Sequence, residues 1–92
     1  MATKLIAYDL NKPGQNYPDL IDAIKALSGS WWHHLDSTWL VRTDLPTTEI
    51  RDRLAVLIDS NDKLLVIDVT DDARAWRGFN QSGSIWLKET WD

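Results

Sequence analysis

The order of the apolar segments constrains this chain most. Four short segments with strand composition and two with helical spacing follow one another as strand, helix, strand, strand, helix, strand. The strands are expected at residues 4–10, 31–35, 38–42 and 63–69, and the helices between residues 16 and 29 and between 44 and 60. Residues 30–43 could alternatively form one long bent strand, because no glycine supplies the positive φ that tight hairpins prefer.

This order is that of a split βαβ unit. It predicts an α+β fold with a ferredoxin-like βαββαβ core, in which two helices cover one face of an antiparallel sheet. Ninety-two residues allow one domain. We expect the core to span residues 1–70 and a C-terminal extension, residues 71–92, to pack on that core or on a dimer partner. Within the extension we expect a helical turn near 71–76, a loop, and a short edge strand at 85–88.

Local signals place the ends of the first helix. Asn16 is a plausible N-cap, Pro18 suits the first turn, and Gly29 is expected to end the helix in a left-handed conformation.

The first and last strands are apolar on both faces. In the first strand the residues expected on one face are Leu5 and Ala7, and those on the other are Ile6, Tyr8 and Leu10. In the last strand Leu64 and Val66 oppose Leu65, Ile67 and Val69. The two helices cover only one face, and leaving several such side chains in water would forfeit several kcal/mol at ~25 cal/mol per Å². A second subunit, the tryptophan-bearing tail, or a tail exchanged between subunits could cover the other face. We therefore predict a homodimer, against the alternative of a wet face with scattered hydrophobic residues.

Charge and composition argue against several classes of protein and of binding site. The chain has no cysteine, hence no disulfide or thiolate metal site. It shows no signal peptide and no apolar run long enough for a membrane span, so we expect a cytoplasmic protein without membrane partners. Ten basic against fourteen acidic residues give a net charge of −4, which argues mildly against a dedicated nucleic-acid binder.

Six tryptophans in so short a chain are the compositional oddity. Tryptophan fills cores more often than it anchors partners or stacks on bases, but it does all three. The candidate contacts to a ligand or partner are Trp32, His34, Trp39, Arg42, Trp76 and Trp86.

One carboxylate occupies a position suited to chemistry. Asp9 ends the first strand beside a polar loop. We expect the first and third strands to be parallel, which would bring Arg42 near Asp9, and Lys63 should lie near too. An ion pair with either is the plain interpretation. The functional interpretation needs a second acid, because one carboxylate is a poor Mg²⁺ site, and a symmetric dimer could supply the second Asp9.

The two adjacent histidines form a weaker candidate. His33 and His34 should point to opposite faces of a strand, so they cannot easily hold one metal. A site would need His34, Asp36 and a distant third ligand.

Residues 4–70 carry a family resemblance. A hydrophobic strand ending in Tyr8-Asp9, then a polar loop, a helix, a glycine and a serine-containing strand, resembles the second CRISPR adaptation protein and related VapD-like toxins. The outline covers residues 4–70. Residues 31–41 and 50–54 are more similar to small bacterial and phage proteins often labelled SinR-like.

The resemblance implies a small ferredoxin-like homodimer. In the CRISPR family the strand-end aspartate is the proposed Mg²⁺ ligand of a nuclease, which corresponds to Asp9 here. This sequence departs from the family pattern where Thr38-Trp39 follows Ser37 in place of Val-Phe.

Two functions remain as hypotheses. The first is a homodimeric module that binds a partner protein or nucleotide, with a role in conflict between phage and host. The alternative is a Mg²⁺-dependent nuclease or phosphodiesterase that uses Asp9 from both subunits. The residues leave open whether the chain is an enzyme, because a shared fold hosts many functions.

Overall fold

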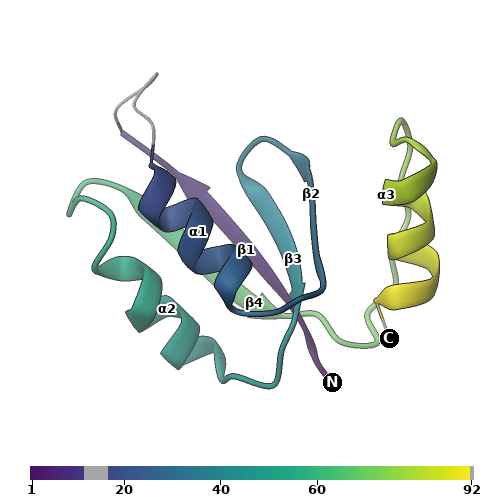
Figure 1. The fold of residues 1–92 in the computed structure, drawn as a ribbon, viewed down its shortest axis with the longest axis horizontal. Helices are drawn as coiled ribbons and strands as arrows, with labels where there is room; N and C mark the ends of the chain where they lie inside the picture. The colour runs from purple at the N-terminus through teal and green to yellow at the C-terminus, as the bar shows by residue number, and fades with distance from the viewer. Residues whose placement is uncertain (12–16, 92) are drawn as a thin grey trace.

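The computed structural model describes residues 1–11 and 17–91, and its elements follow the expected order (Figure 1). They are β1 (Thr3–Asp9), α1 (Pro18–Ala26), β2 (Trp31–Leu35), β3 (Thr38–Arg42), α2 (Thr47–Ala55), β4 (Lys63–Asp68), α3 (Gln81–Ile85) and the π-helical turn η1 (Trp86–Thr90). None of the helices in these residues is long and apolar enough to cross a membrane.

Helix α1 confirms one end signal and contradicts the other. Pro18 takes a first-turn position after Tyr17, while Asn16 lies outside the described residues. The helix ends in a right-handed residue, Leu27, and the only glycine with positive φ in the described part of the chain is Gly78. The left-handed exit predicted at Gly29 is therefore wrong, since the helix ends before it.

The four strands form one antiparallel sheet in the order β2-β3-β1-β4. A two-residue turn, Asp36 and Ser37, separates β2 from β3, so the prediction of two strands is confirmed. The expectation that the first and third strands are parallel is wrong. β1 pairs antiparallel with β3, which places Arg42 opposite Thr3, at the far end of β1 from Asp9. This arrangement is compatible with a ferredoxin-like α+β fold.

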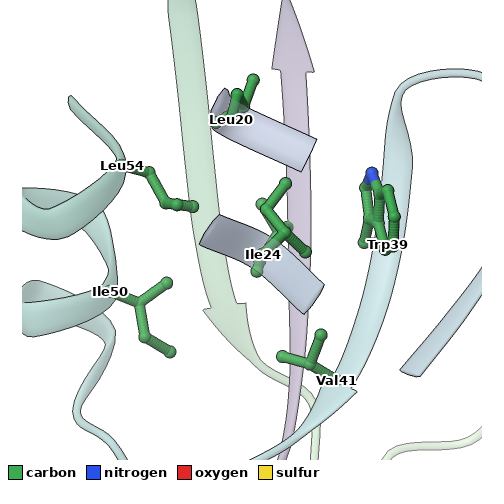
Figure 2. Close-up of a cluster of buried hydrophobic side chains, with 7 residues drawn as sticks. Leu20, Ile24, Trp39, Val41, Ile50 and Leu54 are labelled. Carbon is green, nitrogen blue, oxygen red and sulfur yellow. The ribbon is translucent and has the colours of Figure 1, made fainter. Parts of the chain in front are cut away.

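Helices α1 and α2 cover one face of the sheet. Figure 2 shows their side chains meeting those of the sheet in a single cluster. Its fully buried members are Ile6, Leu20, Ile24, Trp39, Val41, Ile50 and Leu54. The Trp39 indole stacks on His33 with ring centroids 3.8 Å apart and donates a hydrogen bond of 3.0 Å to the Tyr8 hydroxyl. We call this cluster the helix-side core.

The C-terminal extension covers part of the other face. Leu87 and Trp91 pack against Trp32 and Leu40 in a second buried cluster, the tail-side core. In Figure 1 this extension stands apart from α1 and α2, beyond β2 and β3. The edge strand expected at 85–88 is wrong, because these residues belong to α3 and η1. Asn80 starts this helical stretch: its side chain accepts a 2.9 Å hydrogen bond from the Gly83 amide.

The extension leaves the β4 side of this face bare. Leu65 and Ile67 are 53% and 41% exposed, and the β1–β4 register places them beside Ala7 and Leu5. We call Ala7, Leu65 and Ile67 the bare strip. The extension thus covers the second apolar face of β1 at Leu5, which packs against the tail-side core, whereas Leu65 and Ile67 of β4 stay uncovered within one chain.

Candidate binding pocket

A pocket of about 440 Å³ lies between the tail-side face of the sheet and the extension. Its floor comes from Leu5, Leu40 and Trp32, and its rim from Trp76 and Phe79. Ligand sites typically measure ~300–1,000 Å³ and are mostly apolar with a few polar groups. By size and lining, this tail pocket is the principal candidate site. The extension forms one wall, so the pocket depends on what holds that wall in place.

Three hydrogen bonds hold the end of the extension on the sheet. The Trp91 carbonyl accepts from the Thr3 hydroxyl and from the Arg42 guanidinium, which also donates to the Thr3 hydroxyl at 2.6 Å. The Trp91 indole donates to the Val69 carbonyl at 2.9 Å. Hydrogen bonds from a charged donor are among the stronger ones, ~1.5–3 kcal/mol. Arg42 therefore fixes the extension. The sequence-based prediction had instead placed Arg42 beside Asp9.

The first turn of α3 is fixed by Trp32. Its indole donates a 3.1 Å hydrogen bond to the Gly83 carbonyl, and Phe79 meets its ring edge-on at 4.9 Å. The His34 ring lies so close that a Cβ atom on Gly83 would stand 3.2 Å from it. Glycine at this position lets the helix approach β2 closely, and this close approach sets the distance between the extension and the floor of the pocket.

Two arginines line the pocket, and they differ in whether their side chains are held by other residues. The Arg74 Nε donates a 2.7 Å hydrogen bond to the Leu87 carbonyl, and the guanidinium lies 4.8 Å from the centre of the Trp91 ring. Arg77 is exposed, and within residues 1–11 and 17–91 no hydrogen bond or ion pair engages it. Arg74 is thus part of the wall, while Arg77 has a guanidinium available to a ligand.

The structure brings only two of the predicted contact residues to this pocket. Trp32 and Trp76 line it. His34 lies behind Trp32, against Phe79, and the Trp86 indole donates to the Ser30 hydroxyl at 3.2 Å. Trp39 is fully buried in the helix-side core, on the other face of the sheet.

The predicted contact residues did not include Phe79, Leu87 and Trp91, which are the extension's main contributors to the lining. A usable signal existed: Leu87 and Trp91 are four residues apart, which is helical spacing, and follow the cap residue Asn80.

Asp9 lies away from this pocket. It is exposed and stands directly opposite Lys63 in the β1–β4 register, as predicted, where both line a shallower hollow. No group of three histidine, cysteine or acidic side chains that could hold a metal occurs in the described part of the chain. The pairing of two Asp9 carboxylates across a dimer stays a prediction.

Comparisons with protein-family models, with curated proteins and with solved structures found no match to this chain.

Proposed function

We propose that this chain is a non-catalytic, homodimeric binding module of ferredoxin-like fold whose ligand lies in the tail pocket. The observation that carries the proposal is the pocket itself: about 440 Å³, with tryptophans from β2 and from the extension in its lining. Tryptophan offers a large, rigid contact area and is enriched where proteins bind ligands and partners. The element order and the strand order support the ferredoxin-like classification.

A small molecule fits this pocket better than a partner protein does. The hollow lies between two parts of one chain, and Trp76 at its rim is only 38% exposed. A protein partner would need a broad surface of ~800 Å² on each side. We therefore favour a small ligand over the partner protein among the binding hypotheses.

The neutral dye N-phenyl-1-naphthylamine tests the site, because its fluorescence rises in apolar surroundings. We expect saturable binding of one dye per chain, weakened about fivefold in Trp76→Ala through loss of ~1 kcal/mol of aromatic contact. Trp31→Ala is the matched control, since Trp31 is equally exposed at 38% but packs against Trp39 on the helix side. Equal weakening in both variants, or in neither, would contradict the proposal.

The non-catalytic part of the proposal has its own test. RNA, DNA and dinucleotides are incubated with the protein and Mg²⁺, and we expect no cleavage. Cleavage by the wild type that disappears in Asp9→Asn would establish the nuclease alternative in its place.

Two copies pair through the bare strip. Burying half-exposed Leu65 and Ile67 contributes ~1 kcal/mol for each side chain, and two-fold symmetry doubles each contribution. Leu65→Ser should then weaken the dimer by about 2 kcal/mol, roughly thirtyfold in Kd. Val56→Ser is the control, because Val56 is 80% exposed and follows α2. Sedimentation velocity measures the result, and a wild-type monomer at micromolar concentration would contradict the pairing.

A further inference from the structure

Several hydrogen-bonding groups in the lining of the tail pocket are already engaged within the chain. Two of its indole N–H groups are already used, since Trp32 donates to the Gly83 carbonyl and Trp91 to the Val69 carbonyl. The Leu87 carbonyl accepts from Arg74. Polar atoms of a ligand that face these engaged groups would stay unpaired, which is unfavourable where water is excluded.

The lining is positively charged in an acidic chain. The chain carries a net charge of −4, yet among the described residues two arginines and no acidic side chain line this pocket. Arg74 is held by the Leu87 carbonyl and by the Trp91 ring. Arg77 is therefore the group best able to turn toward a ligand. A guanidinium suits a carboxylate, sulfonate or phosphate, which it can bind through two parallel hydrogen bonds.

We propose that the tail pocket selects an amphiphilic anion, with an apolar or aromatic body against Trp32, Leu40 and Trp76 and one anionic group on Arg77. This inference rests on the proposed function and specifies its ligand. A nucleotide shares the flat body and the charge, but its base edges need hydrogen-bond partners. The indole N–H groups of Trp32 and Trp91 are already hydrogen-bonded within the chain, so they cannot pair with a base edge.

Two dyes with the same ring system separate charge from shape. 8-Anilinonaphthalene-1-sulfonate carries one sulfonate, and N-phenyl-1-naphthylamine is its neutral counterpart. We expect the wild type to bind the sulfonate more tightly, and Arg77→Gln to weaken the sulfonate roughly tenfold while changing the neutral dye less than twofold. Arg51→Gln is the matched control, because Arg51 is an exposed arginine on α2, which covers the other face.

The outcomes distinguish the two levels of the proposal. Equal affinity for both dyes, or an Arg77→Gln variant that binds the sulfonate as the wild type does, overturns the anion preference and leaves the pocket standing. Failure of both dyes to bind at one per chain overturns the proposed function. Tighter binding of adenosine monophosphate than of the sulfonate dye also overturns this inference, in favour of a nucleotide site.

Discussion

Replacement of Trp91 by alanine tests whether the extension is part of the folded core. Trp91 is 7% exposed and packs with Trp32, Leu40 and Leu87. Truncation to alanine removes the buried ring, which costs ~3 kcal/mol of stability at the low end for such truncations. It also removes the 2.9 Å hydrogen bond to the Val69 carbonyl, which contributes ~1 kcal/mol. We expect the free energy of unfolding to fall by about 4 kcal/mol, a large share of the ~5–15 kcal/mol typical of a domain.

Urea denaturation followed by far-UV circular dichroism measures this loss. Because Trp91→Ala could leave too little folded protein to measure, Trp91→Phe serves as a second variant. It keeps most of the apolar area and loses the indole hydrogen bond, so we expect a loss of about 1 kcal/mol.

Trp76→Ala is the control, since Trp76 is 38% exposed at the pocket rim and should cost less than about 1 kcal/mol. A loss below about 1 kcal/mol in Trp91→Ala would refute the assignment of the extension to the core. The tail pocket would then lack a stable wall.

Two further variants test local interactions. A hydrogen bond from the Thr70 hydroxyl, followed by the Thr70 amide and the Lys4 charge, lowers the pKa of Asp68 below its ordinary value of 3.8. The carboxylate therefore stabilises the fold above the unfolded-state pKa, and this contribution is lost as the pH falls through the folded-state pKa. Asp68→Asn should accordingly lower the free energy of unfolding at neutral pH, and should make that free energy fall less between neutral pH and pH values below about 4. Urea denaturation across pH measures both effects, and a pH profile unchanged from the wild type would contradict them. Tyr8→Phe removes the hydroxyl that accepts the hydrogen bond from the fully buried Trp39 indole, and should lower the free energy of unfolding by about 1–2 kcal/mol. The same urea denaturation measures this loss. An unchanged midpoint would show that the 3.0 Å hydrogen bond contributes nothing to stability.

The sequence predicted the elements whose own pattern is periodic. The four strands and the helices α1 and α2 follow alternating or helical spacing, and the structure has them in that order. The extension was misjudged because residues 85–88 are apolar enough for a strand. Its short helix depends on one side-chain cap, that of Asn80, and on the space that Gly83 leaves beside His34. Local propensity carries little information about such a segment.

The candidate site was harder to predict than the fold. Trp32 and Phe79 are 47 positions apart, yet their rings lie 4.9 Å from one another. The apolar character of both strand faces indicated that something covers the sheet, but not which segment does so. The error about Arg42 had a different origin, because it came from assuming the wrong direction for the third strand.

The hydrogen bond between Thr3 and Trp91 joins residues 88 positions apart, and it has a consequence for the order of folding. Closing so long a loop costs more entropy than closing a hairpin, so the extension should dock only after β1, β2 and β3 have assembled. Until then Trp32 and Leu40 are exposed on a finished sheet, beside the bare strip. Aggregation during synthesis or refolding should therefore begin on this face, and a ligand that holds the extension down would shorten the time for which it is exposed.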